Sequence, residues 1–257
     1  MARRQPEGPP AAPVVQRLRV RFAKRGRLRF SSHRDFQRAF ERALRRSAVP
    51  MAYSAGFSPH PKVSYAGAAP TGTASEAEYL EIALAQRCDP ERLRAALDAS
   101  LPPDLDVLEV VEARGDSLAD RLEASLWEIR LPGLPSVAVH RSVAAFLAAD
   151  RVEVSRMTKN GLRTFDSRSA VATIEVSEVA AEPGSTDDAS RCAILRMVVR
   201  HLTPAVRPDD VLAGLRQIGD LAPPVTPAVT RLAQGPHDER SGTVSDPLAP
   251  DRDPVGA

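Results

Sequence analysis

His60 is the side chain of this sequence best placed to do chemistry. It lies between Pro59 and Pro61, and Lys62 follows directly. Because the two prolines restrict the backbone, the imidazole would be held in a stiff loop, where packing gives little reason for a histidine. His60 is therefore a candidate general base, for example in metal-independent RNA cleavage. His33 is a weaker candidate, because a histidine near the start of a helix is more often structural.

Other catalytic and metal-binding patterns are missing from the sequence. It has no Gly-x-Ser-x-Gly nucleophile elbow, no Walker motif and no Rossmann glycine pattern. Cys88 and Cys192 are its two cysteines, and neither belongs to a Cys-x-x-Cys pair. This excludes a cysteine-ligated zinc or iron–sulfur site within one chain. We predict no metal, no cofactor and, apart from the candidate His60, no catalytic residue.

Positive charge is concentrated between Arg17 and Lys62. This stretch has 13 basic and two acidic residues, a local net charge of +11, whereas the whole chain carries +2. Such a block is typical of a protein with a polyanionic partner, and we expect RNA. The simpler interpretation is a solvated arginine stripe. The predicted nucleic-acid-binding residues are Arg17, Arg19, Arg21, Arg34, Arg38, Arg42, Arg46, His60 and Lys62.

These arginines fall on two predicted elements. From residue 17 to 22, arginine alternates with apolar residues, which predicts a half-buried strand. Ser32 and Asp35 then have capping-box spacing at the start of a helix. That helix would bury Phe36, Phe40, Ala43 and Leu44 and carry its arginines on another side. The strand and helix arginines would face opposite ways, and we slightly favour the strand face together with the His60 loop.

The order of elements predicts an α+β fold made of two tandem ferredoxin-like (βαββαβ) units. Residues 17–113 read as strand, helix, one or two strands, helix and strand, and the order recurs over 126–233 after a connector at 114–125. Within the first unit, Leu28 and Phe30 are expected to resume a strand. Within the second, Ser136 is expected to cap a helix over 137–149.

Both ends of the chain have the composition of disordered tails. Residues 1–15 are rich in Pro and Ala, and residues 236–257 are rich in Gly, Pro, Asp and Ser. The chain has no run of 18 apolar residues and no apolar signal-peptide core near its start. We therefore expect a cytoplasmic protein without membrane contact.

Two sequence segments resemble the radical-SAM-linked protein family, a bacterial domain of unknown function. They are Phe30-Ser31-Ser32-His33-Arg34-Asp35 with the helix that follows, and Tyr53-Ser54-Ala55-Gly56-Phe57-Ser58-Pro59-His60-Pro61-Lys62. The resemblance is most specific over 17–85 and extends to about 233. It implies a radical SAM protein as partner. A radical SAM enzyme needs three cysteines for its cluster, so this chain is not that enzyme itself.

Three functions remain open from the sequence. The first is a non-catalytic accessory protein that acts with a radical SAM enzyme and binds RNA or presents an RNA or ribosomal substrate. The second is a metal-independent RNA endonuclease with His60 as general base, by analogy at the level of fold alone. The third is a scaffold that binds only proteins. We rank them in this order.

Overall fold

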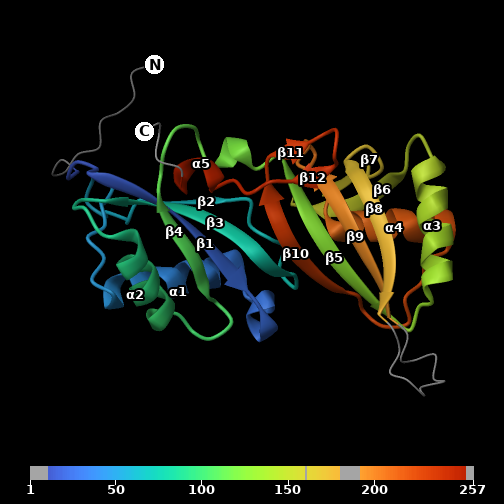
Figure 1. Ribbon diagram of the computed structural model, residues 1–257, viewed down its shortest axis with the longest axis horizontal. Coiled ribbons are helices and arrows are strands. Elements are labelled where there is room, and N and C mark those ends of the chain that lie inside the picture. The colour runs from blue at the N-terminus through green and yellow to red at the C-terminus, as the bar shows by residue number, and fades with distance from the viewer. Residues whose placement is uncertain (1–10, 160, 180–191, 253–257) are drawn as a thin grey trace. The chain divides into compact units, whose positions relative to one another are not determined.

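A computed structural model describes residues 11–159, 161–179 and 192–252 (Figure 1). The fold is α+β, with a mostly sheet core and five α-helices in those ranges. The chain divides into two compact units. Unit 1 consists of residues 1–121 and 247–257, and unit 2 of residues 122–246. The disorder predicted for residues 1–15 falls mostly outside the described residues.

Unit 1 is a four-stranded antiparallel sheet with two helices. Its elements are β1 (Gln16–Lys24), α1 (His33–Arg46), β2 (Val63–Ala66), β3 (Ala74–Leu84), α2 (Pro90–Ser100) and β4 (Val107–Glu112). The strands lie in the order β4-β1-β3-β2, and each neighbouring pair is antiparallel. A short 3-10 helix, η2 (Ala119–Arg121), lies in the predicted connector.

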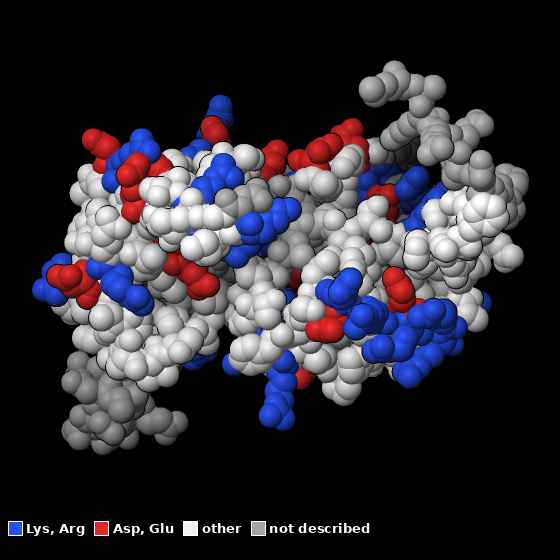
Figure 2. Space-filling model, turned by 180° about the vertical axis from the view of Figure 1, so that it is seen from behind, with Lys and Arg blue, Asp and Glu red and all other residues white. Residues whose placement is uncertain are grey.

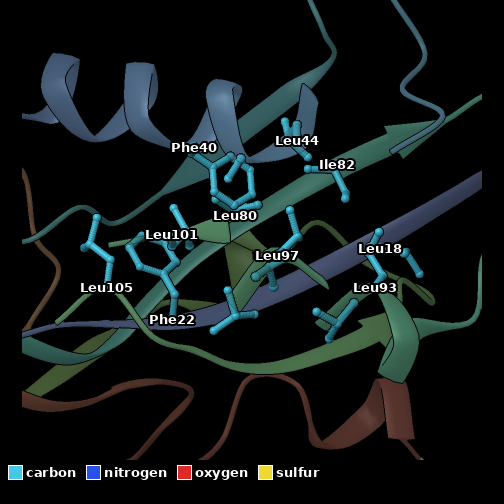
Figure 3. Close-up of a cluster of buried hydrophobic side chains, with 14 of the residues drawn as sticks. Leu18, Phe22, Phe40, Leu44, Leu80, Ile82, Leu93, Leu97, Leu101 and Leu105 are labelled. Carbon is cyan, nitrogen blue, oxygen red and sulfur yellow. The ribbon is translucent and has the colours of Figure 1, made fainter. Parts of the chain in front are cut away.

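Both helices of unit 1 pack on one face of the sheet. Leu18, Val20 and Phe22 of β1 are buried, as their alternation predicts. They meet Phe40 and Leu44 of α1, together with leucines of α2 and β3, in a single apolar core (Figure 3). The arginines that alternate with these residues in β1 therefore point to the face opposite α1 and α2.

The strand predicted at Leu28 and Phe30 is wrong. Residues Gly26–Phe30 form a 3-10 helix, η1, and none of its residues is buried. Gly26 has a φ of +49°, which ends the extended backbone after Arg25. Phe30 is exposed as a result.

Unit 2 repeats the element order of unit 1 with one insertion. Its main elements are β5 (Ala124–Pro132), α3 (Ser136–Ala148), β8 (Val171–Val179), β9 (Cys192–Arg200), α4 (Pro208–Gly219) and β10 (Ala228–Gly235). The strands lie in the order β10-β5-β9-β8, antiparallel throughout. The insertion between α3 and β8 is a separate hairpin, β6 (Glu153–Thr158) with β7 (Gly161–Asp166).

The helix α3 begins one residue earlier than predicted, so Ser136 is not its cap. Pro135 takes the capping position and makes no side-chain cap hydrogen bond. The Ser136 hydroxyl instead donates to the Glu178 carboxylate at 2.6 Å. In contrast, Asp89 caps α2 through its side chain, and Pro208 is the first residue of α4.

The segment after residue 235, predicted as a tail, contains regular structure up to Arg252. Strands β11 (His237–Asp238) and β12 (Thr243–Val244) pair in unit 2. The chain then returns to unit 1, where α5 (Ala249–Arg252) packs beside β4. Leu248 and Asp251 are fully or almost fully buried there, so composition alone misses this contact.

Across the described ranges, no helix is both long and apolar enough to cross a membrane.

Candidate functional site

The arginine side chains of β1 are paired or hydrogen-bonded within unit 1. Arg17 forms an ion pair with Glu81 of β3 at 3.0 Å. The Arg21 side chain donates through Nε to the backbone oxygen of Glu76 at 3.0 Å. Arg25, just after β1, pairs with both Glu76 and Asp106. The acidic side chains of β3, Glu81 and Glu76, are thus the ion-pair partners of Arg17 and Arg25.

Arg19 is buried and cannot contact a ligand at the surface. Its side chain is 2% exposed, and its Nη1 donates to both carboxylate oxygens of Asp251 in α5, at 2.8 and 2.9 Å. It also donates to the backbone oxygens of Arg114 and Asp116 and to Glu81. The prediction that Arg19 binds nucleic acid is corrected on this ground, because α5 covers its part of the sheet face.

The arginines of α1 have the opposite environment. All are exposed, and no side chain among them makes a hydrogen bond or ion pair with a residue in the described ranges; they are Arg34, Arg38, Arg42, Arg45 and Arg46. The side of unit 1 that carries α1 shows a dense group of basic side chains (Figure 2). From residue 34 to 46 this basic face runs for about 18 Å along the helix. We call these five residues the α1 arginine face.

Both ends of α1 are fixed by local hydrogen bonds. Ser32 and Asp35 form the predicted capping box, and Phe36, Phe40 and Leu44 are buried on the inner side. At the other end, the Val49 amide donates to the Leu44 carbonyl at 3.0 Å and the Ala48 amide to the Arg45 carbonyl at 3.2 Å. This pair of bonds is a Schellman motif, with Ala48 in the left-handed region at φ +49°.

The His60 loop is closed at its base and turned by a glycine. The Ser54 amide donates to the His60 carbonyl at 2.9 Å, and the His60 amide donates to Ser54 Oγ at 3.0 Å. Tyr53 and Pro61 form an isolated β-bridge beneath them. Gly56 has a φ of +114°, which favours glycine strongly, and next to it Phe57 is 82% exposed.

A groove separates this loop from the last two turns of α1. It has a volume of about 390 Å³ and is lined by Glu41 and Arg45 on one side and by Tyr53 and His60 on the other. Its base includes the buried side chains of Leu44 and Met51. The structure thus brings His60 beside Arg45 of the α1 arginine face. Lys62, half-buried after the loop, does not line the groove.

His33 has a structural environment at the start of α1. Its ring packs edge-on against Tyr65, with centroids 4.9 Å apart, and its Nε2 accepts from the Gln37 amide at 3.0 Å. Burial raises the pKa of the Tyr65 phenol, and the nearby Glu41 carboxylate raises it further. The phenol is therefore neutral near pH 7 and does not serve as an anion here.

No group of three His, Cys, Asp or Glu side chains within the described part of the chain could hold a metal ion. Sequence reasoning missed Glu41 and Tyr53 as groove residues. The sequence held one sign for each: Glu41 lies four residues before Arg45, and Tyr53 lies at the base of the Pro-flanked loop. The groove itself depends on how the chain turns after α1.

A family model described as "Uncharacterized protein conserved in bacteria (DUF2344)" matches residues 17–208. The chain belongs to this family. The DUF2344 region contains α1, the His60 loop and the whole groove between them.

No curated protein matches the chain. A solved structure titled "DyPB from Rhodococcus jostii RHA1, crystal form 2" is 14% identical and covers 85% of this chain and 88% of that one. The TM-score is 0.20, so this likeness carries no argument about the fold or function of the DUF2344 protein.

Proposed function

We propose that the α1 arginine face binds single-stranded RNA and that the protein is a non-catalytic accessory to a radical SAM enzyme in the cytoplasm. The observation that carries the RNA part is the contrast between two sets of arginines. Those of β1 are paired or hydrogen-bonded inside unit 1, whereas the five of α1 have no partner in the described ranges.

Repulsion between the arginines of α1 lowers the stability of the helix, which supports a polyanion as ligand. Like charges four residues apart destabilise a helix by about 0.2–0.5 kcal/mol per pair. Arg34, Arg38, Arg42 and Arg46 have this spacing, and no acidic side chain among the described residues forms an ion pair with them. Phosphates along a nucleic-acid strand would relieve this repulsion, and condensed counterions would be released on binding.

The radical SAM partner rests on the resemblance of the two segments that flank and form this surface. The DUF2344 match agrees with a bacterial domain of unknown function and does not itself concern radical SAM chemistry. We also infer that both units are ferredoxin-like. Support comes from the shared element order and from the strand orders β4-β1-β3-β2 and β10-β5-β9-β8.

Salt dependence of RNA binding tests the proposal. We expect labelled single-stranded RNA to bind with a slope of about −3 in log K against log salt, from roughly four phosphate contacts. Replacing Arg38 and Arg42 by Gln should flatten this slope by about 1.4. A matched control replaces Arg17 and Arg87 by Gln, since both are exposed but paired with Glu81 and Glu112. Binding that ignores salt, or equal losses in both double variants, would reject the α1 face.

The partner needs its own experiment. Crosslinking and affinity purification of the tagged chain from its own cells should recover a protein with a three-cysteine cluster motif. RNase treatment before purification separates a direct contact from one through shared RNA. If repeated crosslinked preparations lack such a protein, the accessory role is rejected. RNA binding is tested separately by the salt dependence.

The endonuclease remains a second candidate because the groove places His60 with a carboxylate, Glu41. If the protein cleaves RNA, labelled RNA should be cut in the presence of EDTA, and His60→Ala should abolish the cutting. Intact RNA after incubation with the parent protein would remove this alternative.

A further inference from the structure

We propose that the groove between α1 and the His60 loop takes one unpaired nucleobase that carries an exocyclic amino group. This inference rests on the proposed RNA binding and names which part of the RNA the groove reads. The ligand would be held at its phosphates by the α1 arginine face and at one base by the groove. Arg45 belongs to both surfaces.

The groove has the size and polarity of a small-ligand site. Its volume of about 390 Å³ lies at the lower end of the range for such sites, roughly 300–1,000 Å³. Leu44, Val49 and Met51 give it an apolar part, and Glu41, Arg45, Tyr53 and His60 bring polar groups to it. This fits one base with its ribose better than a longer piece of nucleic acid.

Two exposed aromatic rings lie on the loop that forms one wall. Tyr53 lines the groove and is 42% exposed, and Phe57 at the loop tip is 82% exposed. A stiff loop holds them, because Ser54 and His60 close its base and Pro59 and Pro61 restrict its backbone. Rings kept in water on a stiff support, beside unpaired arginines, are what stacking on bases of a single strand requires.

Glu41 supplies the selectivity. Its carboxylate lines the groove and makes no hydrogen bond or ion pair with any residue in the ranges the structure describes. A carboxylate only accepts hydrogen bonds, so its match on a base is an amino group such as N4 of cytosine. Uracil presents a carbonyl oxygen at that position, which a carboxylate repels. The groove should therefore favour cytosine over uracil.

Stacking and charge are separated by measuring both affinity and salt slope. Labelled oligocytidine of ten nucleotides is the probe, and the full chain is the protein. Phe57→Ala and Tyr53→Ala should each weaken binding by roughly 5- to 150-fold, which is the range for one lost base stack. Neither removes a charge, so the salt slope should stay as in the parent. Tyr53→Phe is the matched control and should bind like the parent.

Base preference is tested with oligouridine of the same length. Oligocytidine should bind about 5- to 10-fold more tightly to the parent, and Glu41→Gln should reduce this ratio to near one. Gln keeps the size of the side chain and has both a donor and an acceptor, so it can pair with either base. A duplex RNA of the same length serves as a probe without unpaired bases, and Phe57→Ala should not change its binding.

The outcomes separate this inference from the proposed function. If Phe57→Ala and Tyr53→Ala bind oligocytidine like the parent while Arg38→Gln with Arg42→Gln flattens the slope, the base site is rejected and the RNA face stands. If the parent binds neither oligonucleotide, the proposed function itself fails. An equal affinity for cytidine and uridine that Glu41→Gln does not alter rejects the role of Glu41. Thermal unfolding of each variant confirms that these exposed substitutions leave the fold intact.

Discussion

The guanidinium of Arg19 and the carboxylate of Asp251 are both removed from water, with side chains 2% and 0% exposed. Burial of two charges is costly unless further hydrogen bonds satisfy them. Here Asp251 also accepts from the Arg114 amide and from Arg121, both at 2.9 Å. Both buried charged groups therefore have several hydrogen-bond partners, and the loss of one member leaves an uncompensated buried charge.

Asp251→Asn should accordingly destabilise unit 1 by about 3–5 kcal/mol. Hydrogen exchange at the β1 and β3 amides measures this, because it reports on unit 1 separately from unit 2. Glu112→Gln, which breaks the exposed pair with Arg87, is the control and should cost less than about 1 kcal/mol. Arg19→Met combined with Asp251→Leu should recover only part of the loss, because Arg121 and the Arg114 amide still lose their acceptor. Unchanged protection in Asp251→Asn would show that the buried pair contributes little.

Asp35 gives a pH-dependent contribution at the start of α1. Hydrogen bonding from the Ser32 side chain, and then from its backbone, holds the pKa of Asp35 below its ordinary value of 3.8. A folded pKa below the unfolded one means that the stabilisation is present above pH 3.8 and is lost as the pH falls further. NMR titration of the Asp35 carboxyl should show the low midpoint, and Ser32→Ala should raise it toward 3.8. The same midpoint in both proteins would contradict the capping box as the cause.

Among the elements, α1 ends in a strained position that a single substitution can relax. Ala48 adopts a left-handed conformation, with φ of +49°, in the Schellman motif. A side chain there costs roughly 1–2 kcal/mol, partly offset by the greater freedom of an unfolded glycine. Ala48→Gly should therefore stabilise the protein by about 0.5–1 kcal/mol in chemical denaturation. Ala95→Gly, at an exposed position inside α2, is the matched control and should destabilise by about 1 kcal/mol.

Local patterns predicted the elements that local interactions decide. The capping box at Ser32 and the buried face of α1 are set by residues within one or two turns, and both are confirmed. The alternation over Leu28 and Phe30 misled because the backbone at Gly26 turns out of the strand. The α1 arginine face follows from helical spacing alone. The groove beside it requires the loop from Tyr53 to Pro61 to return against α1, which spacing does not reveal.

At the scale of the whole chain, unit 1 is built from both ends of the sequence. Asp251 lies 232 residues after Arg19, so no pattern near β1 could show that this arginine is neutralised. Composition suggested a tail from residue 236, because Gly, Pro, Asp and Ser dominate there. Pro247, Leu248 and Asp251 are buried instead. The first two are apolar, and Asp251 is paired with Arg19 and Arg121.

Deleting residues 247–257 should therefore damage unit 1 and leave unit 2 folded. We expect a loss of amide protection in β1 and β4, with protection in β5 and β9 unchanged, since the deleted segment belongs to unit 1. Deleting 253–257 alone, which keeps Asp251, is the control and should behave like the parent. Full protection of the β1 amides in the longer deletion would mean that this segment does not stabilise unit 1.

The return of the C-terminal segment also orders events during synthesis. Translation proceeds at about 5–20 residues per second, so the 232 residues between Arg19 and Asp251 take roughly 12–46 s to make. Throughout that interval Arg19 of β1 lacks Asp251, the buried carboxylate that pairs with its Nη1. A chain whose synthesis stops before Asp251 would therefore be damaged in unit 1, at a strand 232 residues away from the missing carboxylate.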